Sequence, residues 1–157
     1  MRRWYHDVAA EVYPDDTIND YRLAIRGEDP TDHFVSEVDG RPMGMIQSYR
    51  IDDDAEYAAM VALDRPAIGI DLFIGEPELI GHGHGPALIR AFLREVAFPR
   101  YGVDLCAIGP ARSNVAAIRA YEKAGFRFLK TYREPDTREP EHYLMELTRA
   151  QLDAADM

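Results

Sequence analysis

The chain has 157 residues, the usual length of one domain that buries a core without disulfides or metal, and we expect a single domain over 1–157. Its one cysteine, Cys106, excludes an intramolecular disulfide, and no apolar run resembles a membrane helix or signal peptide, so we expect a cytoplasmic protein. Eighteen Lys and Arg against 28 Asp and Glu give a net charge of −10, which disfavours nucleic acids and anionic membranes and favours a polycationic ligand.

The first half of the chain predicts helical turns and then strands. Residues 1–25 carry a loosely helical apolar pattern that a Pro-Asp-Asp sequence interrupts. Residues 33–38 and 43–51 predict two strands, and Asp39-Gly40 between them is a strong hairpin signal. Residues 52–56 predict an acidic loop. The nearly continuous apolar run 67–74 is typical of a central strand, which Asp71 interrupts.

The second half predicts helices alternating with strands. A helix is expected over 86–98, a strand over 103–108 and a helix capped by Ser113 that ends at Ala124. Gly125 and Phe126 fit the C-terminal motif of that helix. Two closing strands follow at 126–132 and 142–147, and residues 153–157 predict a frayed tail. This order indicates an α/β (α+β) fold with at least one parallel crossover.

The sequence IGHGHG at 80–85 lies between a predicted strand and a predicted helix. Alternating glycines leave backbone N–H groups accessible next to a helix N-terminus, whose dipole favours an anion. No Gly-Lys-Ser/Thr follows, and the spacing is not Gly-x-Gly-x-x-Gly, so neither a Walker A loop nor a dinucleotide fold is indicated. The loop therefore predicts a pyrophosphate site made by backbone alone, the alternative being a glycine-rich turn before a surface helix.

This loop, followed about thirty residues later by SNVAAIRAYEKAGF at 113–126, resembles the two acyl-CoA-binding motifs of the GNAT superfamily of N-acetyltransferases. Within the superfamily, the sequence Gln47-Ser48-Tyr49, Asp64 and the Gly-Ile-Asp ending at Asp71 resemble the aminoglycoside 6′-N-acetyltransferases. Siderophore-type and lysine N-acyltransferases share much of this pattern. The resemblance implies a mixed, mostly antiparallel sheet with a central parallel strand pair and flanking helices.

The resemblance implies acetyl-CoA as cofactor. The backbone of Leu72, Phe73 and Ile74 would run beside the pantetheine and polarise the thioester carbonyl. Asn114 would bind the pantetheine arm, and Lys123 would meet a CoA phosphate or only complement the helix C-terminus. Backbone N–H groups for the pyrophosphate would come from the loop residues Gly81, His82, Gly83, His84, Gly85 and Pro86.

The expected chemistry needs a proton acceptor for the amine and a proton donor for the departing thiolate. A carboxylate such as Asp71 can orient an ammonium and accept its proton, unless it is only an ion-paired aspartate. By resemblance, Tyr121 would donate a proton to the CoA sulfur, its alternative being a core tyrosine. Asp64 would bind a second ammonium or remain a solvated loop acid. The expected substrate-binding set is Gln47, Ser48, Tyr49, Asp64 and Asp71.

Three features depart from the family's pattern. Ile80 stands where the acyl-CoA signature has Gln or Arg, which matters little to a site built from backbone N–H groups. Gly109 stands where these resistance enzymes commonly have Asp before a proline, so one contact to an aminoglycoside is missing. The chain begins at what resembles the middle of the family's first helix, so we expect the N-terminal strand to be absent or truncated.

The resulting hypothesis is an acetyl-CoA-dependent N-acetyltransferase acting on a primary amine, the 6′-amine of an aminoglycoside, by direct attack in a ternary complex. Two alternatives stay open: a siderophore or lysine-type N-acyltransferase, and a non-catalytic acyl-CoA-binding module. We expect no metal site, because a Gly-x-Gly loop presents His82 and His84 to solvent or phosphate. The expected partner is a polycationic small molecule, and the protein is expected to be a monomer or homodimer.

Overall fold

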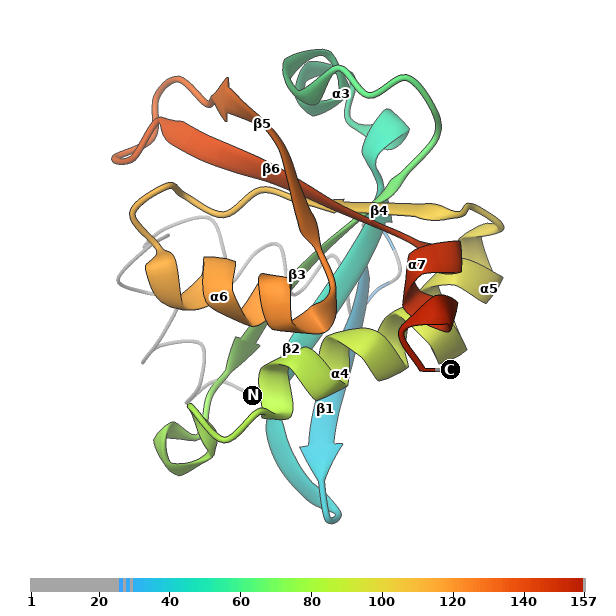
Figure 1. Cartoon of the computed structure of the whole chain (residues 1–157), viewed down its shortest axis with the longest axis vertical. Coiled ribbons are helices and arrows are strands. Elements are labelled where there is room, and N and C mark those ends of the chain that lie inside the picture. The colour runs from blue at the N-terminus through green and yellow to red at the C-terminus, as the bar shows by residue number, and fades with distance from the viewer. Residues whose placement is uncertain (1–25, 27, 29, 157) are drawn as a thin grey trace.

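The computed structural model describes residues 26, 28 and 30–156, which form one six-stranded sheet with helices on both faces (Figure 1). The predicted N-terminal helices and the expected loss of a first strand fall outside the described residues. The strand order is β1-β2-β3-β4-β6-β5. The strands are β1 (Asp32–Val38), β2 (Arg41–Arg50), β3 (Ile68–Ile74), β4 (Leu105–Ile108), β5 (Arg127–Arg133) and β6 (Glu141–Thr148).

The sheet is antiparallel except at its centre, as predicted. Strands β3 and β4 pair in parallel, but only through Ile68 with Cys106 and Gly69 with Ala107. Strand β3 continues to Ile74 along β2, so beyond Gly69 its second edge has no strand neighbour among the described residues. The parallel pair therefore separates towards the C-terminal ends of both strands.

The β1–β2 hairpin follows from its Asp-Gly sequence. Asp39 has φ 52° and Gly40 has φ 74°, so both central residues are left-handed, as a two-residue hairpin turn of the favoured hand requires. The pairing of β1 with β2 then runs from Val38–Arg41 to Asp32–Ser48. The predicted hairpin is thus confirmed.

The helical elements are η2 (Ile51–Asp53), α3 (Ala55–Val61), η3 (Pro77–Leu79), α4 (His84–Phe92), η4 (Leu93–Ala97), α5 (Phe98–Tyr101), α6 (Val115–Ala124) and α7 (Arg149–Ala154). The helix predicted from 86 begins two residues earlier and continues to Tyr101 through a π-helical turn. The change of hydrogen-bond register lies next to Pro99, which has no N–H to donate.

Each face of the sheet carries its own hydrophobic cluster. On one face, Ile89 and Leu93 pack with Ile68, Ile70 and other strand residues beneath α4 and α6 (Figure 1). The cluster on the other face includes Val61 of α3. Alternation along β4 shows how one strand serves both clusters: Cys106 and Ile108 belong to the first cluster, and Leu105 and Ala107 belong to the second. Burying each aliphatic side chain contributes about 1.5–3 kcal/mol.

Two predictions about helix starts were wrong. The acidic residues after β2 do not form a loop: Asp54 caps α3 by accepting a hydrogen bond from the Tyr57 backbone N–H at 2.9 Å. Ser113 is not the cap of α6, because Asn114 Oδ1 accepts from the Ala117 backbone N–H at 3.2 Å. The end of α6 agrees with the prediction, since the Phe126 N–H bonds to the Tyr121 carbonyl at 3.0 Å.

The predicted tail from 153 begins too early. Helix α7 continues to Ala154, and Thr148 and Gln151 form a capping box at its start. Leu152 is fully buried. The carboxylate of Asp156 pairs with arginines 90 and 94 of the helix that starts at His84. The C-terminal residues that the structure describes are therefore packed on the domain.

Candidate active site

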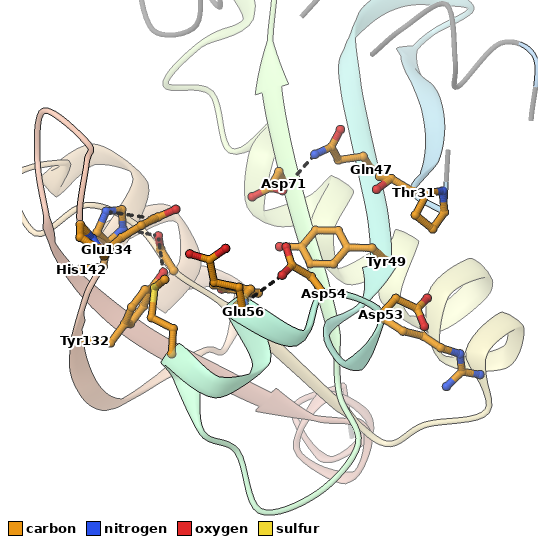
Figure 2. A pocket seen from close by; sticks show the side chains of 16 residues that line it. Thr31, Gln47, Tyr49, Asp53, Asp54, Glu56, Asp71, Tyr132, Glu134 and His142 are labelled. Carbon is orange, nitrogen blue, oxygen red and sulfur yellow. Dashed lines mark hydrogen bonds and ion pairs between the residues drawn. The ribbon is translucent and has the colours of Figure 1, made fainter. Parts of the chain in front are cut away.

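A pocket of about 540 Å³ opens on the α3 face of the sheet, between β2, β3 and the end of β5 (Figure 2). Arg50 is the only Lys or Arg among the described lining residues, and its guanidinium donates to the Tyr101 carbonyl at 2.6 Å. The walls are therefore strongly acidic, a charge that attracts cations. The lining carboxylates are Asp53, Asp54, Glu56, Asp71 and Glu134.

Asp71 reaches this pocket because the side chains of β3 alternate. Ile70 is buried in the core, and the next side chain points to the opposite face. On β2, Gln47 is the direct partner of Asp71, and its Nε2 donates to Asp71 Oδ2 at 3.0 Å. The charged side chain that interrupts an apolar strand is thus a pocket residue with a hydrogen-bond partner of its own.

The surroundings of Asp71 favour its protonated form. Although the side chain is open to the pocket, the protein around it removes bulk water, and this desolvation raises the pKa of Asp71. The negative charge of Glu134 raises that pKa further, whereas the hydrogen bond from Gln47 lowers it. A carboxylate with a raised pKa is a better proton acceptor than a fully solvated one.

Three tyrosines form one wall of the pocket. Tyr49 contacts Tyr57 edge to face with ring centroids 6.4 Å apart, and Tyr57 contacts Tyr132 in the same way at 6.2 Å. Gly69 makes room for this wall, because a Cβ there would lie 2.4 Å from Cζ of Tyr49. Burial and the charge of Asp71 raise the pKa of Tyr49 well above its usual value, so its hydroxyl stays protonated.

Two predicted substrate residues lie elsewhere. Ser48 is fully buried on the other face of β2, where its Oγ lies 3.1 Å from the Tyr101 hydroxyl, so a direct substrate contact from it is not supported. The strand alternation that brings Gln47 and Tyr49 into the pocket turns Ser48 away. Asp64 is exposed between α3 and β3 and is not among the described residues that line the pocket.

The Tyr132 side chain occupies the space that a side chain at position 109 would need. A Cβ on Gly109 would lie 2.0 Å from the Tyr132 hydroxyl oxygen. The carboxylate that the family pattern puts at this position would therefore collide with a buried aromatic ring. The charge of the pocket comes instead from residues such as Glu56 and Glu134.

Sequence reasoning missed His142. Its Nδ1 lies 2.9 Å from the Gly109 carbonyl oxygen, and its ring stacks on Tyr132 with centroids 5.2 Å apart. Its Nε2 lies 3.5 Å from Glu134 Oε2. The only available signal was the alternation predicted for residues 142–147, which does not say which face meets a pocket.

The glycine loop has the conformation that the phosphate hypothesis needs. Gly81 and Gly83 have φ of 81° and 83°, which other residues rarely adopt. Gly83 caps α4 without any side-chain hydrogen bond, and the first intrahelical bond runs from Ala87 N–H to the Gly83 carbonyl at 3.3 Å. The amides of His84 and Gly85 are thus left as donors at the positive end of the helix.

Pro86 was wrongly predicted to supply an N–H group, because proline has none. The other cofactor prediction concerns the free edge of β3. There Leu72, Phe73 and Ile74 pair with β2 on one side, while the pairing with β4 has already ended. This free edge fits a pantetheine arm whose amides need backbone partners.

Comparison with known proteins decides the family. Residues 3–133 match the family described as an acetyltransferase (GNAT) domain. The chain belongs to the GNAT acetyltransferase family. The resemblance drawn from the sequence is thereby confirmed, and the cofactor of this GNAT enzyme is acetyl-CoA.

Relatives of the GNAT chain include aminoglycoside-modifying proteins. It is 28% identical over 147 residues to an aminoglycoside N(6′)-acetyltransferase type 1 of Klebsiella pneumoniae, covering 94% of this chain and 72% of the relative. It is 37% identical over 82 residues to a kanamycin resistance protein of Rhizobium radiobacter, and the match covers 52% of this chain and 73% of the relative. The crystal structure of aminoglycoside acetyltransferase AAC(6′)-Ib with coenzyme A and kanamycin has a TM-score of 0.74, 23% identity, and coverage of 99% of this chain and 91% of that chain.

The second GNAT motif lies on α6. Tyr121 is half-buried with its ring 6.1 Å from Phe126, and burial together with the charge of Asp71 raises the pKa of its hydroxyl. Asn114 Oδ1 is used as the helix cap, which leaves the side-chain N–H groups of this exposed residue to donate to a ligand. Lys123 is exposed in the last turn, where it complements the helix dipole.

Within residues 26, 28 and 30–156, no group of three or more His, Cys, Asp or Glu side chains is placed to hold a metal ion. No helix in the same part of the chain is both long and apolar enough to span a membrane.

Proposed function

We propose that this GNAT enzyme acetylates a primary amine of a polycationic sugar, the 6′-amine of an aminoglycoside. The observation that carries the proposal is the pocket itself, in which Asp71 is one of five lining carboxylates beside the point where β3 and β4 separate. The aminoglycoside-modifying relatives support the same substrate class.

In this proposal, Asp71 prepares the nucleophile. A substrate ammonium has no free lone pair, so it must lose a proton before it can attack a carbonyl carbon. Asp71 orients the ammonium and accepts that proton, while the amide of Gln47 keeps its carboxylate facing the pocket. Glu134 adds negative charge near Asp71 and strengthens its affinity for a proton.

Tyr121 supplies the second proton. Bound acetyl-CoA supplies the acetyl group as a thioester. The nitrogen forms the N–C bond, the C–S bond breaks, and the phenol of Tyr121 protonates the departing sulfur. The second proton that the nitrogen loses on becoming an amide restores the phenol. Because the pKa of Tyr121 is raised, the phenol carries its proton throughout the neutral range.

Direct transfer is favoured over an acyl-enzyme. The one thiol, Cys106, is fully buried, and burial raises its pKa well above the usual value, so it is not a reactive thiolate. The burial of this thiol supports direct attack by the acceptor in a ternary complex. The lysine-type alternative would suit a less acidic pocket than this one, and a non-catalytic module would not need the acid–base pair Asp71 and Tyr121.

The test is CoA release by the purified protein with kanamycin, with a lysine-type amine and with no acceptor. We expect turnover with kanamycin and acetylation at its 6′-amine, located by mass spectrometry and NMR of the product. Turnover with the lysine-type amine alone would contradict the aminoglycoside proposal and favour the first alternative. Binding of acetyl-CoA with no turnover on either amine would favour the non-catalytic module.

A further inference from the structure

The imidazole of His142 is fixed in one orientation at the wall of the pocket. Its Nδ1 lies 2.9 Å from the Gly109 carbonyl oxygen, which can only accept a hydrogen bond. Nδ1 therefore carries a proton, and in the neutral ring the lone pair is on Nε2. The ring also stacks on Tyr132, with 29° between the ring planes, and this contact favours the same orientation.

The second nitrogen of His142 has no hydrogen-bond partner among the described residues. Nε2 is buried and lies 3.5 Å from Glu134 Oε2, while the two side chains are 13% and 38% exposed. In the neutral ring, two acceptors thus face each other without a donor between them. Such an arrangement is costly unless a proton or an external donor satisfies both.

The charged groups around the pair favour a cation there. Glu134 at the end of β5 adjoins the ring, and it acts electrostatically on Asp71 of β3. Glu56 of α3 lines the same pocket. On β6 itself, Glu141 is exposed and paired with Arg133 at 2.8 Å. A cation at the pair therefore meets mainly negative charge.

We propose that Glu134 and His142 form a subsite for a second ammonium group of the acetyl acceptor, which displaces the proton held between Nε2 and the carboxylate. The inference rests on the proposed function only in assigning this pocket to the acceptor. The subsite replaces the carboxylate that position 109 lacks, because the Gly109 carbonyl now holds the imidazole instead. The subsite favours acceptors that carry two cationic groups, spaced so that one reaches Asp71 while the other reaches Glu134 and His142.

Displacement of a proton gives the subsite a measurable signature. Calorimetry in two buffers with different ionisation enthalpies counts the protons released when kanamycin or 1,5-diaminopentane binds. At about pH 6 the wild type should release more protons than His142→Gln, because the glutamine variant has no imidazole proton to lose. Equal release by the two proteins with both probes would overturn the subsite.

Two carboxylate variants complete the test. Glu134→Gln should weaken binding of both probes by about tenfold, the usual effect of losing one hydrogen bond to a charged group. Glu141→Gln is the matched control, because this carboxylate is exposed, pairs with Arg133 and does not line the pocket, and it should leave binding unchanged. Equal weakening by both variants would show only general electrostatics and contradict the subsite.

The test also separates this inference from the proposed function. Proton release with the diamine, together with no acetylation of kanamycin, would leave the subsite in place and refute the aminoglycoside assignment. Acetylation of kanamycin with no His142-dependent proton release would leave the assignment in place and refute the subsite.

Discussion

The two halves of the proposed site, the acceptor pocket and the cofactor side, are built in different ways. The acceptor pocket depends on side chains, such as Asp71 with its partner Gln47 and the tyrosine wall. The cofactor side depends on backbone, namely two left-handed glycines, an open helix N-terminus and the free edge of β3. Substitutions that change a side chain and keep the backbone should therefore impair the acceptor pocket far more than they impair binding of the cofactor.

The largest expected effect is that of Asp71→Asn, which removes the proposed proton acceptor and keeps the size of the side chain. The turnover number should fall by about 10²–10⁴-fold, the usual contribution of a general base. CoA release at saturating acetyl-CoA measures it. Asp64→Asn is the control, since Asp64 lies outside the pocket lining, and its rate should stay within about twofold of the wild type. An unchanged rate in Asp71→Asn would refute the role of Asp71.

Gly85→Ala tests the backbone half. Gly85 is in the first turn of α4, its φ is not positive, and a Cβ there would meet nothing within 4 Å. Alanine should stabilise the helix by up to about 1 kcal/mol, yet raise the KM for acetyl-CoA by about tenfold if a pyrophosphate approaches this backbone. Thermal unfolding and steady-state kinetics measure the two effects. A more stable protein with an unchanged KM would place the pyrophosphate elsewhere.

Gly109→Asp tests whether the acceptor half can regain the family's carboxylate. The new side chain would collide with the Tyr132 hydroxyl, and overpacking of this kind costs about 1–3 kcal/mol. Urea unfolding measures the loss. In a Tyr132→Phe background, which lacks the colliding oxygen, the same substitution should cost less. An equal cost in both backgrounds would show that the collision is relieved in another way.

The raised pKa of Asp71 predicts a conflict between activity and stability. Because the folded pKa is above the unfolded one, the folded protein binds a proton more tightly, and this stabilisation is lost as the pH rises through the folded pKa. Asp71→Asn should therefore unfold at a higher temperature than the wild type at pH 7, and the gap should close below about pH 4. A difference in unfolding temperature that does not change with pH would show that the asparagine acts through packing and not through the loss of the charge.

Ser48→Ala gives the smallest expected effect and marks the boundary of the pocket. It removes a buried hydrogen bond to Tyr101, which should cost about 1 kcal/mol of stability. The KM for the acceptor should not change, because the hydroxyl faces the other side of the sheet. A raised KM with unchanged stability would return Ser48 to the substrate-binding set.

The sequence predicted the backbone half better than the pocket. Glycine spacing and an Asp-Gly turn are local signals, so the loop at Gly81 and Gly83 and the β1–β2 hairpin could be placed directly. Asp71 could be found because a charge inside an apolar strand is costly to bury and therefore stands out. The order of strands and helices predicted a parallel crossover, and the resemblance placed the parallel pair at the centre of the sheet.

Long-range contacts could not be predicted in the same way. Tyr132 and His142 reach the pocket from β5 and β6, and nothing local marks which face of those strands meets it. Helix α3 was mistaken for an acidic loop because its cap, Asp54, is one of three consecutive aspartates. Ser48 was misplaced because it lies between two true pocket residues, and only the strand period separates them.

The contact between Gly109 and Tyr132 has a consequence for how such pockets diverge. An ancestor with a carboxylate at 109 and a smaller residue at 132 could not reach the present arrangement by one substitution. Changing 109 first removes a charge and leaves a void, and introducing the tyrosine first creates the collision. The two pocket types are therefore separated by a less stable intermediate, and a swap between them in the laboratory should begin with both substitutions together.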